Sequence, residues 1–179
     1  MTEYLFPDNT VLCNFAAVSR LDLLKSALGG RGRWTEAVAY EASRSARKLT
    51  ALRDLATDGW LDEPIEITEV SDIQKIERIR RGVLGGTDAE PLKHLGEAQT
   101  CFVIRNWPAF AGSWWVSDDR DAVRWAKRQG IRTHETIDLM TIAVAYGDIV
   151  AADAFHLMQQ MANADRHLRL PKSAEELRR

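Results

Sequence analysis

Hydrophobic positions along the chain alternate between short strand-like runs and longer stretches with helical spacing. Strand-like runs lie at residues 4–6, 65–70, 114–116 and 131–133, and the run at 65–70 alternates apolar and polar residues with period two. Apolar residues at helical spacing predict helices over 9–18, 20–28, 35–55, 72–81, 89–105, 121–129, 136–146 and 150–168. Strands separated by helices predict an α/β fold, a three-layer sandwich with a central, largely parallel sheet and C-terminal helices.

Length and composition set the domain organisation. The chain has 179 residues, of which 45% are hydrophobic and 28% charged, with a formal net charge of −2. These values exclude a disordered chain and a protein coated with basic residues, and the length favours one domain. We expect that domain to span residues 1–170. The polar tail, residues 171–179, is expected to fray.

Two negative observations bear on location. No apolar run approaches the roughly 20 residues of a membrane span, and the first residues, MTEYLFPDNT, lack the pattern of a signal peptide. We therefore expect a cytoplasmic protein that does not enter a membrane. Its two cysteines, Cys13 and Cys101, are expected to be reduced, because neither has the spacing of a zinc site.

Acidic residues follow two of the predicted strands. Asp8 follows the first strand, and Asp118 and Asp119 follow the run at 114–116. Ligands of open α/β sheets usually bind beyond the carboxyl ends of the strands, so these acids are candidates for chemistry. An aspartate between a strand and a helix is also a good helix N-cap, and that alternative stays open.

Two further acids lie within predicted helices beside small or apolar residues. Ala37, Val38 and Ser45 lie three or four positions from Glu41, so the helical period places them near its carboxylate. Glu97 shares its side of a helix with apolar residues at positions 101 and 104, which indicates an enclosed environment. A buried acid needs a partner or a cation.

Asp8, Glu41, Glu97 and either Asp118 or Asp119 could converge in one acidic pocket. Two carboxylates about 4 Å apart repel by roughly 4 kcal/mol at an effective dielectric near 20, so such a pocket requires protons or a cation. Oxygen ligands favour Mg²⁺ or Mn²⁺.

The order of these motifs resembles the PIN-domain family of metal-dependent nucleases, over roughly residues 3–150. The first strand and acid, Leu5-Phe6-Pro7-Asp8, is similar to the family's opening motif, and Tyr40-Glu41-Ala42 to its second acid. Gly96-Glu97-Ala98 is similar to the Gly-Glu-Ala motif of one branch. Trp115-Val116-Ser117-Asp118-Asp119-Arg120-Asp121-Ala122 is similar to the segment that carries the fourth acid.

The resemblance implies a PIN-like endoribonuclease in which carboxylates hold one or two divalent ions that activate water against RNA phosphodiesters. Asp8, Glu41, Glu97 and Asp119 would be the ligands, with Asp118 assisting and Asp121 as an outer acid. Thr10 and Ser117 could orient a ligand or a water, although capping is an alternative for both.

We also expect a rim of basic residues around the acids and one or more protein partners. Arg44 and Lys48 follow Glu41 by three and seven residues, so they could bind flanking phosphates, and Arg31, Arg33 and Arg120 could extend the rim. The resemblance further implies the toxin of a bacterial toxin–antitoxin pair. Apolar residues of the last helix, Phe155, Leu157, Met158 and Met161, could then bind the antitoxin or a second copy. The alternative is a non-catalytic PIN-like interaction module.

Overall fold

The computed structural model describes residues 2–178; Met1, at the start of the expected domain, and Arg179, at the end of the expected tail, lie outside the described residues. Within this range the chain forms three strands and eight α-helices. These are β1 Leu5–Pro7, α1 Asn9–Ala17, α2 Leu21–Leu28, α3 Glu36–Ser45, α4 Val70–Gly82, α5 Leu95–Asn106, β2 Trp114–Val116, α6 Arg120–Arg128, β3 Arg132–His134, α7 Thr136–Tyr146 and α8 Ala151–Asn163. Short 3₁₀ helices occupy η1 Thr50–Leu52, η2 Pro108–Phe110 and η3 Ala174–Arg178.

The three strands form one parallel sheet in the order β1-β2-β3. Leu5 pairs with Trp114, which in turn pairs with Arg132. Because the strands are parallel, their carboxyl ends meet at one edge of the sheet. The N–H of Asp8 donates to the carbonyl of Val116 at 2.9 Å, so the segments that follow β1 and β2 begin side by side.

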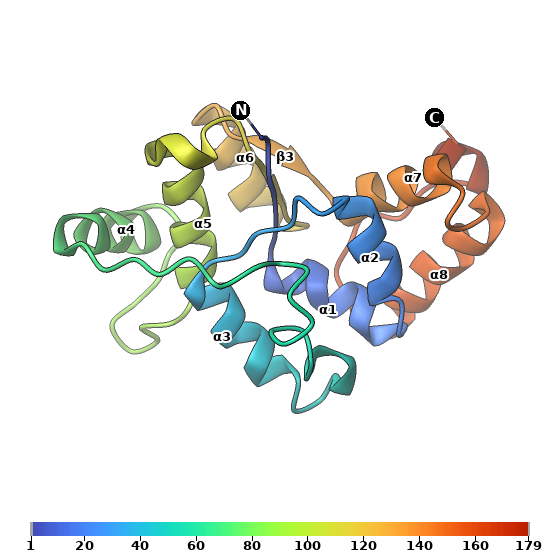
Figure 1. Cartoon of the computed structure of the whole chain (residues 1–179), viewed down its shortest axis with the longest axis horizontal. Coiled ribbons are helices and arrows are strands. Elements are labelled where there is room, and N and C mark those ends of the chain that lie inside the picture. Colours follow the sequence, from blue (N-terminus) through green and yellow to red (C-terminus); the bar gives the residue numbers. More distant parts are fainter. Residues whose placement is uncertain (1, 179) are drawn as a thin grey trace.

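Helices cover both faces of the sheet (Figure 1). Leu5 and Val116 face a core shared with α1, α2, α7 and α8, whereas Phe6 and Trp115 face a second core shared with α4, α5 and α6. Successive strand residues point to opposite faces, and a sheet buried on both faces therefore carries continuous apolar runs. This confirms the three-layer α/β fold with a parallel sheet and C-terminal helices.

Two predicted elements differ most from the structure. The helix expected over 35–55 ends at Ser45, after which the chain makes turns and η1. The strand expected at 65–70 is not formed: Ile65 makes an isolated bridge to Thr35, and Glu69 and Val70 already belong to α4, as its N-cap and first residue. Ile65 and Ile67 are buried and Glu66 is exposed. The alternation in the sequence therefore arises because one side of this extended segment faces the core.

The C-terminal segment also differs from expectation. Residues 174–178 form η3, and Leu177 is fully buried against α7 and α8, so the prediction of a fraying tail is wrong for these residues. Met158 and Met161 are likewise fully buried, and Phe155 and Leu157 pack against the same core. Met158 and Met161 therefore belong to the core, whereas Phe155 and Leu157 remain partly exposed.

Both cysteines are buried free thiols, as expected. Across residues 2–178, every helix is too short or too polar to traverse a lipid bilayer.

Candidate active site

Asp8 lies at the junction of β1 and α1 and is almost fully buried. It is the N-cap of α1: its Oδ1 accepts from the N–H of Asn9 at 2.8 Å, and its Oδ2 accepts from the Thr10 hydroxyl at 2.8 Å. Burial raises the pKa of Asp8, these hydrogen bonds oppose the rise, and the charge of Asp119 adds to it. The cap fixes the carboxylate, so the structural and the chemical interpretations of Asp8 are compatible.

Ser117, directly after β2, connects Asp8 to the start of α6. Its hydroxyl donates to Oδ2 of Asp8 at 3.4 Å and accepts from the N–H of Asp119 at 3.2 Å. Asp119 is the N-cap of α6, and its Oδ1 accepts from the N–H groups of Asp121 and Ala122. One oxygen of Asp119 is thus used by the helix, and the side chain is held beside Asp8.

Glu41 approaches this pair from α3. Its Oε1 would lie 3.0 Å from a Cβ atom at Gly96, so any larger residue there would require the Glu41 side chain to shift. Burial raises the pKa of Glu41 to about 8, and the charges of Asp8 and Glu97 contribute to the rise. An acid with this pKa is largely protonated at neutral pH unless a cation is present.

Glu97, in the first turn of α5, belongs to the same group. Its side chain is 14% exposed, and its Oε2 lies 2.6 Å from Nδ1 of His94. Burial and the charge of Asp8 raise the pKa of Glu97 to about 7, while His94 opposes this shift and Asp119 adds to it. His94 is the residue that precedes α5, and its backbone is left-handed, with φ of 62°.

Asp118 has a different environment from Asp119. Its Oδ1 accepts from the N–H of Thr136 at 3.0 Å, and its Oδ2 accepts from the Thr136 hydroxyl at 2.5 Å and from Nδ2 of Asn14 at 2.9 Å. Nε of Arg166 in turn donates to Oδ1 of Asn14 at 3.2 Å. Burial raises the pKa of Asp118 to about 6, against the pull of the Thr136 bonds. Both oxygens of Asp118 therefore join β2 to α1 and α7.

The structure thus brings four predicted acids into one group, which we call the acid cluster: Asp8, Glu41, Glu97 and Asp119. Their charges act on one another although they come from four separate elements. Asp118 lies beside the cluster and is engaged by Thr136 and Asn14. Asp121 lies outside it, because its side chain is 91% exposed and pairs with Arg124.

The ligand atoms of the acid cluster match the preference of a divalent ion in type, but their side chains do not yet converge on one point. Four carboxylates offer only oxygen, the ligand type that Mg²⁺ and Mn²⁺ prefer. Burial, together with the charges of neighbouring acids, raises the pKa values of Asp8, Glu41 and Glu97, and a bound cation would offset this cost. Among residues 2–178, however, no three or more His, Cys, Asp or Glu side chains already converge as a formed metal site. The cluster fits a hard cation in chemistry, and binding requires its side chains to close further.

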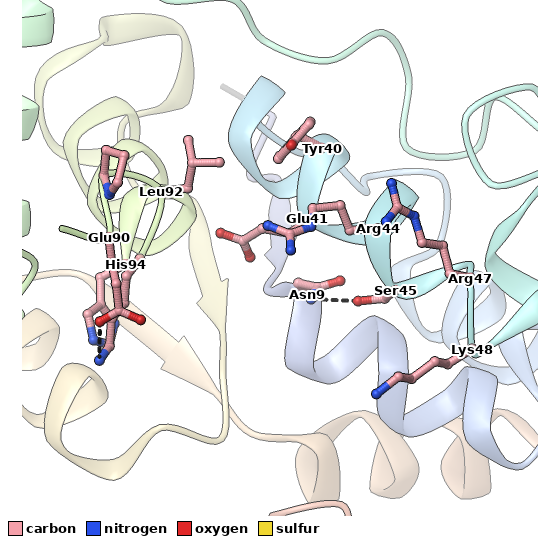
Figure 2. Close-up of a pocket in the computed structure, with 12 residues that line it drawn as sticks. Asn9, Tyr40, Glu41, Arg44, Ser45, Arg47, Lys48, Glu90, Leu92 and His94 are labelled. Atoms are coloured by element: carbon pink, nitrogen blue, oxygen red, sulfur yellow. Dashed lines mark hydrogen bonds and ion pairs between the residues drawn. The ribbon is translucent and has the colours of Figure 1, made fainter.

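Two clefts adjoin the acid cluster. The first, about 820 Å³, lies between α3 and residues 90–94 and contains Glu41 (Figure 2). Its cationic lining consists of Arg44, Arg47, Lys48 and Lys93, and His94 lines it as well. The second, about 440 Å³, contains Asp118 and Asp119 and is lined by Arg120, Arg166, His167 and Arg169. Cations therefore border the acids on both sides.

Arg44, Lys48 and Arg120 lie in these clefts. Arg33 does not, because its N–H donates to the carbonyl of Leu5, at the start of β1, and its guanidinium pairs with Asp62 at 2.8 Å. Arg31 precedes it at the same edge, where its carbonyl accepts from the N–H of Leu5. The expectation that these two arginines extend the rim is wrong, since the start and the end of a strand lie at opposite edges of the sheet.

Sequence reasoning missed several residues of the site. His94 is not among the predicted site residues, although its position three residues before Glu97 at a helix start was a usable signal. Asn14 and Arg166 had no such signal, because they meet Asp118 only through tertiary structure.

Comparison with protein families gives one match, which covers residues 6–178 and is described as a PIN domain (DUF3368). Neither the search of curated proteins nor that of solved structures found a match. The family match spans nearly the whole chain, including all four acids and the helices after them. The fold described above, with its parallel three-stranded sheet, agrees with it. The chain is a member of the PIN domain family.

Proposed function

We propose that this protein is a divalent-metal-dependent endoribonuclease that hydrolyses RNA phosphodiester bonds. The proposal is carried by one observation: four carboxylates from separate elements form a single group at the carboxyl edge of the sheet. Members of the PIN family are generally nucleases, and the fold here is of that family. Such a concentration of buried acids is costly without a counter-charge, which supports a cation-binding role over a purely structural one.

Asp8, Glu41, Glu97 and Asp119 would hold Mg²⁺ or Mn²⁺. The bound ion would lower the pKa of a coordinated water and offset charge on the scissile phosphate. Ser117 and Thr10 fix the orientation of the Asp8 carboxylate through its Oδ2. His94 holds Glu97 in place. Asp118 supports the site indirectly, by anchoring β2 to α1 and α7 through Asn14 and Thr136.

The cationic clefts support RNA as the substrate. Within residues 2–178, Arg44, Arg47 and Lys48 form no ion pair with an acidic side chain, so their charges are free to bind phosphates. On the other side of the acids, Arg120 and Arg166 line the second cleft. A single strand following both clefts would pass the acid cluster, and phosphate contacts of this kind position a strand without reading its sequence.

The decisive variant is Asp8→Asn. Asparagine keeps an acceptor for the N–H of Asn9 and is itself a good N-cap, so the fold should be retained. We expect wild-type protein to cleave single-stranded RNA with Mn²⁺, and to gain thermal stability as Mn²⁺ is added. Both effects should disappear in Asp8→Asn. Cleavage by the variant at the wild-type rate would exclude the site, and wild-type protein with neither effect would favour a non-catalytic PIN-like module.

We further propose that the protein acts as the toxin of a bacterial toxin–antitoxin pair. The support is the Gly96-Glu97-Ala98 motif, which resembles that of one PIN branch and whose Glu97 lies near Asp8 and Asp119. Expression should arrest growth in the wild type and not in Asp8→Asn. A small protein encoded beside it should restore growth and bind the chain. Light scattering of the purified chain alone decides whether it forms the expected homodimer.

A further inference from the structure

A second, smaller cavity opens beside Glu41 between α3 and α5. We call it the α3–α5 cavity; its volume is about 230 Å³, and it is lined by Glu36, Ala37, Tyr40, Glu41, Leu92, Leu95 and Gln99. Pockets for drug-sized ligands occupy about 300–1,000 Å³, so this one suits a single small ring system. It shares Tyr40, Glu41 and Leu92 with the large cationic cleft, so the two spaces are continuous at the acid cluster.

The walls of the α3–α5 cavity are apolar and aromatic. Tyr40 is 49% exposed and Leu92 is 41% exposed, and the two side chains face one another across the cleft mouth (Figure 2). Exposed apolar side chains at the mouth of a charged cleft have no role in the core. A tyrosine ring in this position can stack on a planar base, and such stacking accepts any base.

One side of the cavity carries two hydrogen-bonded polar side chains, the buried Gln99 and the exposed Glu36. Gln99 is buried; its Oε1 accepts from the N–H of Ala37 at 3.1 Å, and its Nε2 donates to Oε1 of Glu36 at 3.2 Å. The same Glu36 oxygen accepts from the N–H of Ile67. These bonds fix the Glu36 carboxylate at one oxygen and leave Oε2 without a hydrogen bond inside the described chain.

We propose that the α3–α5 cavity binds one nucleobase of the RNA next to the cleaved bond, with Tyr40 stacking on its ring and Oε2 of Glu36 accepting from an exocyclic amino group. The inference rests on the proposed ribonuclease function and specifies its substrate. Adenine, cytosine and guanine carry such a donor. Uracil has no exocyclic amino group, and its one base-edge donor, N3–H, lies between two carbonyl oxygens that the Glu36 carboxylate would repel.

The test uses RNA binding and RNA cleavage as separate measurements. The probes are short uridine tracts that contain one adenosine, cytidine, guanosine or inosine, and an all-uridine tract. Binding is measured by fluorescence anisotropy with the Asp8→Asn protein, and cleavage is mapped with the wild type and Mn²⁺. We expect the amino-bearing bases to bind about tenfold more tightly than uridine, since hydrogen bonds to charged groups are among the stronger ones. Guanosine should exceed inosine, which lacks the amino group, and cleavage should occur at one fixed position beside the preferred base.

Variants assign the preference to the cavity. Glu36→Gln should reduce the discrimination against uridine, and Tyr40→Ala should weaken binding of all tracts at least about fivefold, whereas Tyr40→Phe should restore it. Tyr146→Ala is the matched control, because Tyr146 is an exposed tyrosine at the end of α7 and lines neither cavity. Thermal unfolding of each variant confirms that it folds.

The outcomes separate the two proposals. Equal binding of all tracts, or an unchanged preference in Glu36→Gln, overturns the base-binding role and leaves the nuclease proposal standing. Absence of cleavage under all conditions overturns the nuclease proposal. The anisotropy data then still decide whether the cavity selects a base.

Discussion

Gly96 lies directly against the carboxylate of Glu41, at the contact between α5 and α3. A Cβ atom at position 96 would be 3.0 Å from Oε1 of Glu41 and 3.0 Å from Cγ2 of Val38. The glycine that precedes Glu97 therefore has a steric function: it allows an acid on one helix to reach the acid on the next.

Gly96→Ala should disturb this contact. The added methyl group would crowd the side chains of Glu41 and Val38, which should cost about 1–3 kcal/mol of stability and reduce Mn²⁺ binding, because the Glu41 carboxylate must shift. Gly82→Ala, at the end of α4, is the matched control, since nothing lies within 4 Å of a Cβ there. Chemical denaturation and Mn²⁺ titration of both variants measure the difference, and equal behaviour would show that the contact is unimportant.

Stability of the metal-free protein should fall as the pH rises. The pKa of Glu41 is about 8 in the folded protein, against an ordinary value of 4.5. Between these values the folded chain binds more protons than the unfolded chain, so the free energy of unfolding decreases with rising pH. Each pKa unit corresponds to about 1.4 kcal/mol, and Glu97, with a pKa of about 7, contributes in the same direction.

Thermal unfolding from pH 5 to pH 9 tests this dependence. Glu41→Gln, which stays neutral, should show a weaker decline, whereas Glu66→Gln, an exposed glutamate outside the site, should keep the wild-type slope. Mn²⁺ should restore stability at high pH in the wild type. A flat profile in the wild type would contradict the assignment of a buried, repelling group of acids.

Asp118 and Asp119 should respond differently to the same substitution. Asp118→Asn replaces an acceptor that bonds Thr136 and Asn14 with an amide group, leaving donors unmatched, so it should destabilise the fold by about 1–3 kcal/mol. Asp119→Asn keeps the helix cap and removes only charge, so cleavage should be lost with little change in stability. Chemical denaturation and cleavage assays of both variants test this assignment. It would be contradicted if Asp119→Asn lost stability and Asp118→Asn lost only cleavage.

RNA binding should depend on salt through the cations of α3. Each phosphate contact with a single strand contributes about 0.7 to the slope of log affinity against log salt. The double variant Arg44→Ala, Lys48→Ala should therefore lower the slope by about 1.4. Lys127→Ala with Arg128→Ala is the control, since these exposed cations end α6, far from its start beside the acids. An unchanged slope in the α3 variant would remove these residues from the RNA surface.

The strand-end part of the site follows from the sequence more directly than the helix-borne part. Asp8 and Asp119 follow apolar runs that form parallel strands, and parallel strands necessarily bring such residues to one edge. Glu41 and Glu97 could be placed on helices, but their meeting depends on the packing of α3 against α5, which periodicity does not encode. Gly96 is the local feature that permits it.

The segment at 65–70 shows why alternation misled the fold prediction. Ile65 and Ile67 are buried and Glu66 is exposed, as in a strand, yet the backbone of Ile67 donates to a Glu36 side chain and has no neighbouring strand. Alternation of apolar and polar residues shows which side of an extended segment is buried. It does not show whether the backbone of that segment pairs with another strand.

Asp8 and Asp119 each give one oxygen to the first turn of a helix. The architecture consequently needs an acceptor at these places, whereas hydrolysis needs the negative charge. An amide oxygen can accept the same hydrogen bonds but carries no charge. Under the proposed mechanism, a single Asp→Asn replacement at position 8 or 119 would therefore remove hydrolysis and leave the fold intact. One such replacement would be enough to turn this fold into a module that only binds RNA or protein.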